Sequence, residues 1–502
     1  MQRLIVTAFC LFTSLPLFGQ FVYVANANDN NISGYGVDDT TGVLTPIPGS
    51  PFATGTFPRS VTVDPTSRFV YVANLGDNSV SGFTINAATG ALTSIPGSPF
   101  AAGSGPICIT VDPHGRFAYV ANFSQQSISQ YTINAVTGAL IPGTSVAGAG
   151  ALQSLAVDPT GTLLYSTNAF LPASVSGFTI NQSTGALNNI GSFLTGSLPL
   201  SVAVDPTGRF AYVANADDKD VSGFAINAAT GALTSIPGSP FAAELNPVFV
   251  AADPAGRFVY VVNTGSDNIS AYTINAATGA LGAATGSPFP TELRPQSMAV
   301  DSTGRFAYAG NGANNISGYT IDAASGALTP IPGSPFAAGS VPQSIAITPS
   351  LNTPFAEFEV RDLDISCNED DDDDRNDIRF RLNGEFTPGT TSKGIDPVHQ
   401  TVTLGIGNFS LSIPAGMFKS DRDRDYFLFK GTIEGANVDF EIRDEHSRHD
   451  WKDDAQESTF RVEARGVDLS RQPNPVKVSL KIANNTGSAS VKRERDCPDR
   501  HH

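Results

Sequence analysis

Two glutamates stand at equivalent places in a region that otherwise has none. Glu244 lies in "AAELNP" and Glu292 in "PTELRP", and no other glutamate occurs between residues 20 and 350. Arg294 follows Glu292 by two residues, and Arg59 stands in the comparable stretch "ATGTFPRS". Carboxylates can serve as general acid, general base or cation ligand, and an arginine can steady an anion. These four residues are candidate catalytic residues if the protein is a hydrolase; the alternative is ordinary variation on surface loops.

A second group of polar residues lies in the same kinds of loop. The stretch "ADDKD" carries four consecutive charged side chains from position 217, where other copies of the loop read "LGDNS" or "FSQQS". Such departures from a repeated pattern are where recognition can arise. The candidate ligand-binding residues are Asp217, Asp218, Lys219, Asp220, Asn246 and Gln296.

The scarcity of histidine and tryptophan in this region excludes several chemistries. His114, in "DPHGR", is the only histidine between residues 20 and 350, and the chain's single tryptophan is Trp451. The sequence therefore offers no histidine cluster for haem or copper and no plausible Ser-His-Asp triad. Neither a glycine-rich phosphate loop nor a "GxSxG" elbow occurs.

The elements that carry these residues repeat along the chain. "NAATGALTSIPGSPFAA" occurs unchanged at residues 86–102 and 227–243, and strand patterns of the "FVYVAN" type begin seven units of 46 to 48 residues. Each unit contains four short strand patterns separated by turn residues, which indicates the blade of a β-propeller. The sequence thus predicts an all-β fold: a seven-bladed β-propeller followed by a β-sandwich domain.

The repeat also predicts which loops share a face. Successive turns of an antiparallel sheet alternate between its two ends. The "DPTGR" and "NAATG" turns should therefore lie on one, nearly uniform face, and the loops after "YVAN" and "GSPF" on the other, variable face. The last strand pattern, "SIAITPS" at 344–350, should complete the first blade and close the ring.

The repeat "VDPTGRFAYVANxxxxxVSGFxINAATGAL" resembles the Tyr-Val-Thr-Asn repeats of bacterial seven-bladed, lactonase-like propellers. That family includes 6-phosphogluconolactonases and exported proteins of unknown role, and the resemblance covers about residues 20 to 350. We expect an exported binding or surface-interaction protein that recognises a protein, glycan or small molecule on its variable face. The alternative that the family name implies is a lactonase-type hydrolase acting on a sugar or related lactone.

Residues that recur in most of the units favour architectural roles. A repeated aspartate should cap its turn by accepting backbone N–H groups, rather than join a ring of metal ligands. The recurrent arginines should contact neighbouring blades or solvent, with a phosphate-binding ring as the alternative. The aspartates are Asp64, Asp112, Asp158, Asp205, Asp253 and Asp301, and the arginines are Arg68, Arg116, Arg209, Arg257 and Arg305.

The first nineteen residues resemble a secretory signal peptide, with one arginine before an apolar run. We therefore expect domains at 1–19 (signal peptide), 20–350 (propeller) and 351–502 (acidic β-sandwich), in a secreted, periplasmic or surface-exposed bacterial protein. Export permits a disulfide between Cys367 and Cys497. A net charge of −17 argues against a nucleic-acid partner. No mature segment is apolar enough for a membrane span, and we expect a monomer.

The C-terminal region alternates apolar and charged residues, as in "NVDFEIR" and "TFRVEAR", which favours a sandwich of strands with one wet face. Two acidic runs could bind Ca²⁺, although solvated acidic loops are the alternative. No other cofactor is expected. The possible calcium ligands are Asp370, Asp372, Asp374, Asp421, Asp423 and Asp425.

Overall fold

The structure, a computed structural model, describes residues 18–349 except 149 and 171, together with the backbone of eleven strands after residue 349. All regular structure in these residues is β-strand. The chain divides into two compact units, 1–349 and 350–502. Within the described residues, no helix is long and apolar enough to cross a membrane. The predicted signal peptide lies almost entirely outside these residues, so export stays a prediction.

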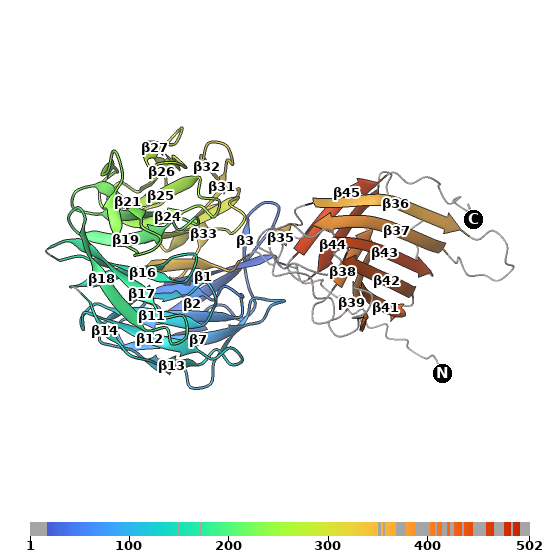
Figure 1. Ribbon diagram of the computed structural model, residues 1–502, viewed down its shortest axis with the longest axis horizontal. Coiled ribbons are helices and arrows are strands. Elements are labelled where there is room, and N and C mark those ends of the chain that lie inside the picture. Colours follow the sequence, from blue (N-terminus) through green and yellow to red (C-terminus); the bar gives the residue numbers. More distant parts are fainter. Residues whose placement is uncertain are drawn as a thin grey trace, which may run out of the picture. The chain divides into compact units, whose positions relative to one another are not determined.

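Seven antiparallel sheets build the first unit, as the repeat predicts (Figure 1). In the second blade, the inner strand β5 (Pro58–Val63) pairs with the second strand β6 (Phe69–Asn74), which pairs with the third strand β7 (Ser79–Ile85). The second strands are buried along their whole length, because each lies between two neighbouring blades. This explains why "FVYVAN" is apolar on both faces.

The other blades repeat this order. Blade one has β34 (Pro342–Ile347), β1 (Gln20–Asn26), β2 (Asn31–Val37), β3 (Leu44–Pro46) and β4 (Phe52–Ala53). Blade three has β10 (Pro106–Val111), β11 (Phe117–Asn122), β12 (Ser127–Ile133), β13 (Leu140–Pro142) and β14 (Val146–Ala147). Blade four has β15 (Leu152–Val157), β16 (Leu163–Asn168), β17 (Ser174–Ile180) and β18 (Leu187–Leu194). Blade five has β19 (Pro199–Val204), β20 (Phe210–Asn215), β21 (Asp220–Ile226), β22 (Leu233–Ser235) and β23 (Phe241–Ala242). Blade six has β24 (Pro247–Ala252), β25 (Phe258–Asn263), β26 (Asn268–Ile274), β27 (Leu281–Ala283) and β28 (Phe289–Pro290). Blade seven has β29 (Pro295–Val300), β30 (Phe306–Asn311), β31 (Asn315–Ile321), β32 (Leu328–Pro330) and β33 (Phe336–Ala337).

Six blades contain a fifth, two-residue strand that the sequence pattern did not predict. In blade two, β8 (Leu92–Ser94) pairs with one end of β7, and β9 (Phe100–Ala101) pairs with the other end. The turn between them is held by Ser98, whose hydroxyl accepts the N–H of Gly82 at 2.9 Å. The stretch "GSPFAA" is therefore partly strand and not only loop.

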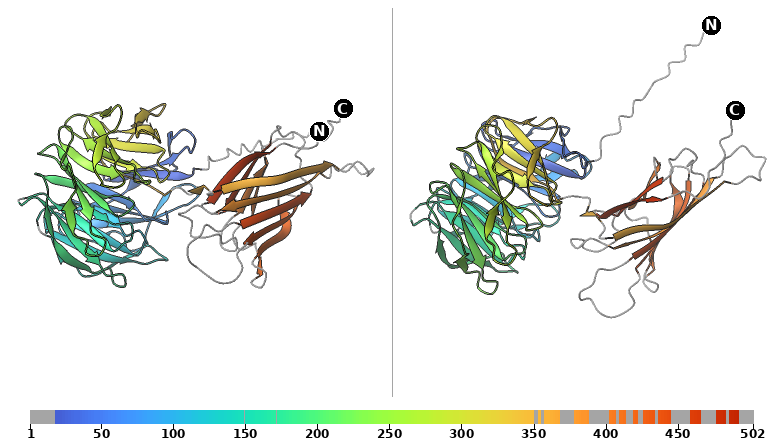
Figure 2. Two further views of the ribbon diagram at one scale, coloured as in Figure 1. Left: turned by 45° about the horizontal axis from the view of Figure 1, so that its top comes forward. Right: turned by 90° about the horizontal axis from the view of Figure 1, so that it is seen from above.

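The ring closes through the two ends of the propeller sequence. Strand β34 pairs with β1 through contacts such as Val24↔Ile345, and the two strands lie side by side in Figures 1 and 2. Thr348 binds Phe21 in both directions, each at 2.8 Å: its hydroxyl accepts the Phe21 N–H and its own N–H donates to the Phe21 carbonyl. Each inner strand contacts the inner strands of both neighbouring blades, so the inner strands encircle the propeller axis.

A buried tyrosine in each second strand ties its blade to the next. Tyr71 donates its hydroxyl to the carbonyl of Gly138 at 2.7 Å, and Tyr308 reaches Gly42 across the closure at 2.7 Å. The acceptor glycine has a positive φ in its "NAATG"-type turn, +73° at Gly138, which only glycine adopts readily. The tyrosines are Tyr23, Tyr71, Tyr119, Tyr165, Tyr212, Tyr260 and Tyr308.

The repeated aspartates cap their turns, as predicted. All six are buried. Asp205 accepts the N–H groups of Arg209 at 2.8 Å and Phe210 at 2.7 Å through one oxygen, and that of Thr207 at 3.2 Å through the other. Each carboxylate accepts hydrogen bonds within its own turn, so these six residues do not form a metal site.

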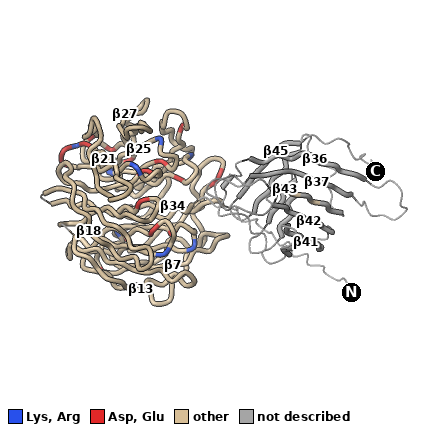
Figure 3. Tube along the Cα trace, viewed as in Figure 1, with Lys and Arg blue, Asp and Glu red and all other residues tan. Residues whose placement is uncertain are grey.

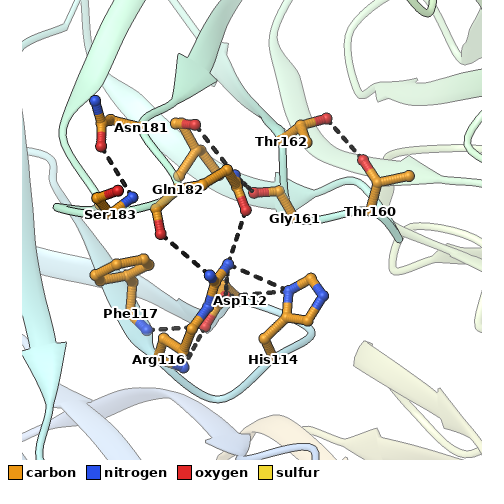
Figure 4. Close-up of polar contacts among 12 residues, drawn as sticks. Asp112, His114, Arg116, Phe117, Thr160, Gly161, Thr162, Asn181, Gln182 and Ser183 are labelled. Atoms are coloured by element: carbon orange, nitrogen blue, oxygen red, sulfur yellow. Dashed lines mark hydrogen bonds and ion pairs between the residues drawn. The ribbon is translucent and has the colours of Figure 1, made fainter.

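Four of the five repeated arginines donate to a carbonyl of the next blade, while Arg305 donates to Thr303 of its own turn. Arg116 donates to the Gln182 carbonyl at 3.1 Å and to its side-chain oxygen at 2.9 Å, and it also binds Asp112 at 3.2 Å (Figure 4). His114 lies in the same cluster, with Nδ1 3.5 Å from the Asp112 carboxylate. Every repeated arginine also lies over the phenylalanine that follows it, at 4.9 to 5.3 Å from the ring centre. These contacts favour an inter-blade role over a phosphate-binding ring.

The second unit contains two described sheets. One has the order β35-β45-β44-β38-β39 and the other β36-β37-β43-β42-β41-β40. Asp421 ends β40, while Cys497 and the other candidate calcium ligands lie outside the described residues; the sandwich, the disulfide and the calcium site stay predictions. The strands are β35 (Thr353–Pro354), β36 (Glu357–Cys367), β37 (Ile378–Thr387), β38 (Val402–Ile406), β39 (Phe409–Ile413), β40 (Lys419–Asp421), β41 (Tyr426–Ile433), β42 (Ala436–Asp444), β43 (Ser458–Arg465), β44 (Val476–Ile482) and β45 (Asn485–Val491).

We predict that the propeller loses stability at alkaline pH because of the seven buried tyrosines that join neighbouring blades. Burial raises the pKa of all seven tyrosines above the ordinary value of 10.0. Unfolded tyrosines ionise near pH 10 while the folded ones keep their protons, so the free energy of unfolding should fall as the pH rises through about 10 and beyond. Urea unfolding from pH 8 to pH 11.5, with tyrosinate absorbance followed in parallel, measures this. Ionisation of these tyrosines without loss of stability would contradict it.

Asp205→Ala should destabilise the propeller by about 3 kcal/mol, because three backbone N–H groups lose a buried charged acceptor. Asp217→Ala is the matched control: Asp217 is an exposed aspartate in the same blade, and its replacement should leave the unfolding midpoint unchanged. Chemical denaturation of both variants tests the capping role. Similar midpoints for the two variants would refute it.

Candidate functional site

The hydrogen bonds confirm the two predicted faces. Arg68, in a "DPTSR" turn, donates to the carbonyl of Ala135 at 2.8 Å in the neighbouring "NAVTG" turn. At the opposite strand ends, the loop after "YVAN" meets the loop that enters the inner strand: Leu75 N–H donates to the Phe57 carbonyl at 3.0 Å. We call the first the turn face and the second the loop face. All the candidate catalytic and ligand-binding residues belong to loops or strand ends of the loop face.

Part of the variation on the loop face serves the scaffold. Asp218 accepts the N–H of Ser197 at 2.7 Å, and Gln125 accepts that of Ser104 at 3.0 Å, with the same separation of 21 residues. A second contact, at a separation of 27 residues, joins Asp267 to the N–H of Arg294 at 2.6 Å. Asp218 is therefore committed to fixing the neighbouring loop, and its carboxylate is only in part available to a ligand.

The remaining ligand-binding candidates differ in exposure and in whether their side chains already make a hydrogen bond. Asp220 is half-buried and accepts the Asn215 amide at 2.7 Å; burial raises the pKa of its carboxyl. Lys219 and Asn246 are exposed and adopt left-handed backbone angles, with φ of 58° and 55°, which places them at turn positions. Asp217 is exposed. Only the exposed side chains of this group can meet a ligand without breaking a contact.

Glu244, Glu292 and Arg294 lie exposed on the loops that lead into β24 and β29. Both glutamates occupy the position held in other blades by a glycine such as Gly55 or Gly196. Among the described residues, no ion pair joins these three side chains to one another or to Arg59. The structure brings them to one face, but it does not assemble them into a contacting cluster. Figure 3 marks how sparse charged positions are along the propeller.

A ring of bulged residues surrounds the axis at the loop face. In blade two, Pro58 pairs with Asn74 and Ser60 with Ala73, so Arg59 is the extra residue of a β-bulge. The register shifts at the same place in every inner strand. Bulges often lie beside functional sites because they redirect a side chain. The residues at this position, all half-buried, form what we call the axial ring: Arg59, Ile107, Gln153, Leu200, Val248, Gln296 and Gln343.

Arg59 is the only charged member of the axial ring. Its guanidinium makes no hydrogen bond or ion pair with any residue that the structure describes, although every repeated arginine of the turn face has partners. Burial lowers the pKa of Arg59 from its ordinary value, but an arginine stays charged at neutral pH. A half-buried charge without a partner is costly, and an anion that binds it would recover part of that cost.

The order of the blades groups three polar members of the axial ring together and places two aliphatic members across from Arg59, with Ile107 and Gln153 between Arg59 and Leu200. Gln296, Gln343 and Arg59 are consecutive, since β29, β34 and β5 are neighbouring inner strands. Leu200 and Val248 belong to β19 and β24, the two inner strands farthest around the ring from β5. Gln296 is oriented by a hydrogen bond from its amide nitrogen to the Arg294 carbonyl at 3.2 Å. The ring can thus offer a cation and amides on one side and aliphatic carbon on the other.

Sequence analysis named Arg59 and Gln296 but missed the ring that relates them. The signal was present in the repeat: the residue after the first proline or leucine of each inner strand varies while its neighbours recur. The 21- and 27-residue spacings on the loop face were also readable in the repeat. As for metals, no group of three or more histidine, cysteine, aspartate or glutamate side chains gathers in the described part of the chain.

Comparison with known proteins identifies the propeller. The model of the family "Lactonase, 7-bladed beta-propeller" matches residues 17–108, 99–250 and 235–343. Crystal structures assigned as 6-phosphogluconolactonases from Bacteroides uniformis and Bacteroides fragilis align over 66% of this chain and 99% and 98% of theirs, with TM-scores of 0.58 and identities of 18% and 21%.

The periplasmic gluconolactonase PpgL of Pseudomonas aeruginosa aligns with a TM-score of 0.56 and 20% identity, over 66% of this chain and 99% of its own. At these identities the likeness to solved structures concerns the fold. The search of curated proteins gave no match. Since the family model spans most of the propeller, the chain belongs to the lactonase family of seven-bladed β-propellers.

Proposed function

We propose that the propeller is a lactone hydrolase that works at the axial end of its loop face. The observation that carries the proposal is membership of the lactonase family over residues 17–343, combined with an unpaired arginine at the axis. Hydrolysis of a lactone creates a carboxylate, so the product carries one more negative charge than the substrate. A half-buried cation such as Arg59 would stabilise the charge that develops on the carbonyl oxygen and then on the product.

The reaction needs a water molecule and a base. An ionised glutamate would take a proton from water as the water oxygen bonds to the lactone carbonyl carbon. The bond between that carbon and the ring oxygen then breaks, the ring oxygen receives the proton, and a hydroxy acid leaves. Glu292 is the better placed of the two glutamates, because its loop enters β29 and only β34 separates β29 from β5, which carries Arg59. Glu244 enters β24, one inner strand farther away.

A second candidate function is recognition without turnover on the loop face. It is favoured by the exposure of both glutamates and by the location of the propeller's only histidine, His114, on the turn face. Its ligand would be a protein, glycan or small molecule, as the sequence suggests. The assay below distinguishes the two functions.

Glu292→Gln should lower kcat by at least 100-fold on whichever lactone the wild type hydrolyses, because a general base contributes about 10²–10⁴-fold. A pH-stat assay of the full chain would use glucono-δ-lactone, 6-phosphogluconolactone and dihydrocoumarin. Asp322→Asn, on the turn face, is the control and should retain wild-type rates, because five other blades have asparagine at this place. Glu244→Gln should lose less than tenfold.

Absence of turnover on all three classes of lactone would count against the hydrolase and favour the binding function. Turnover that Glu292→Gln leaves intact, but that Glu244→Gln abolishes, would identify Glu244 as the general base. Turnover that survives the double variant would remove both glutamates from the mechanism.

A further inference from the structure

We infer that the axial ring binds a singly charged carboxylate with an apolar carbon body, with Arg59 holding the carboxylate and Leu200 and Val248 contacting the body. The inference concerns the acid that the proposed hydrolase would release, and through it the class of lactone substrate, and therefore rests on that function for its biological meaning. The binding site itself rests on the ring's own residues.

The charge of the site argues for a single negative charge on the ligand. Arg59 is the one cation of the axial ring, and it has no partner among the described residues. Arg294 lies in the same loop as Glu292, two residues away, so these two charges offset each other. The chain's net charge of −17 adds no attraction for a multiply charged anion. A phosphosugar acid, with a dianionic phosphate as well as a carboxylate, would bring more charge than the ring can neutralise.

Hydrogen-bond donors stand beside the cation. Gln343 follows Arg59 directly around the ring on the neighbouring inner strand, and Gln296 follows Gln343. A carboxylate has two oxygens and accepts several hydrogen bonds, which an arginine fork and neighbouring amides can supply. Four turn-face arginines do not offer this combination, since they already donate to carbonyls of the next blade.

The two aliphatic residues across the ring from Arg59 argue for an apolar body. Leu200 and Val248 are half-buried at the bulge position of β19 and β24, across the ring from β5. A polyhydroxylated sugar acid would leave its hydroxyl groups without partners against these side chains, which costs free energy, whereas a hydrocarbon ring would lose water-exposed apolar area. The site therefore favours a carboxylate such as cyclohexanecarboxylate over gluconate.

Calorimetric titration of the full chain tests the inference with three probes: cyclohexanecarboxylate, gluconate and 6-phosphogluconate. Cyclohexanecarboxylate should bind at least tenfold more tightly than either sugar acid. Arg59→Gln should weaken its binding by at least 30-fold; glutamine already occupies this ring position in three other blades, so the fold accommodates it. Arg305→Gln, which removes one positive charge from the turn face, is the control and should change the Kd less than threefold.

Two further readouts separate binding from stability. Leu200→Gln should weaken the binding of cyclohexanecarboxylate and leave the binding of acetate unchanged. In the absence of ligand, Arg59→Gln should raise Tm, because it removes an unpaired half-buried charge. A lower Tm with unchanged affinity would assign Arg59 to the scaffold and overturn the inference.

The outcomes also distinguish this inference from the proposed hydrolase. Arg59-dependent binding of cyclohexanecarboxylate without turnover of any lactone would uphold the axial site and refute the hydrolase. Lactone turnover that depends on Glu292, with a substrate selectivity that Arg59→Gln does not alter, would uphold the hydrolase and refute the axial site. Preference for 6-phosphogluconate over the apolar carboxylate would overturn the inference about substrate class.

Discussion

The hydrogen bond from a buried tyrosine to the turn of the next blade is the contact on which the ring depends. It occurs in all seven blades at 2.7 to 3.1 Å. The glycine that accepts it must stay glycine, since a Cβ at Gly90 would lie 2.3 Å from the ring of Phe21 in the adjacent blade. The "NAATG" turn is therefore a docking element for its neighbour.

Much of the propeller was predictable because each repeat reports its own local structure. Turn residues, alternating strands and the 46- to 48-residue period gave the blades, the closure and the two faces. The caps at Asp64 and its equivalents followed from the chemistry of a short carboxylate in a turn. The fifth strand did not follow, because Phe100 and Ala101 pair with β7 only through a two-residue ladder that leaves no periodic pattern.

The candidate site was less predictable, for a physical reason. A bulge is one residue out of register, and the letters around Arg59 do not show that Pro58 and Ser60 pair with adjacent residues of β6. Exposure is likewise invisible in a sequence: Asp218 and Asp220 read as free carboxylates, yet each accepts a hydrogen bond within the scaffold. The sequence did predict the contrast between a uniform turn face and a variable loop face.

Closure by β34 also has a consequence for how the protein is made. The first blade takes its inner strand from the far end of the propeller sequence, with Phe21 bound to Thr348 across a separation of 327 residues. During synthesis, β1 leaves the ribosome with one hydrogen-bonding edge open and keeps it open until the last of the seven units has been translated. The nascent propeller is thus a sheet with an unprotected edge for nearly its whole elongation time, and its final ring-forming step pays the largest loop-closure entropy in the domain.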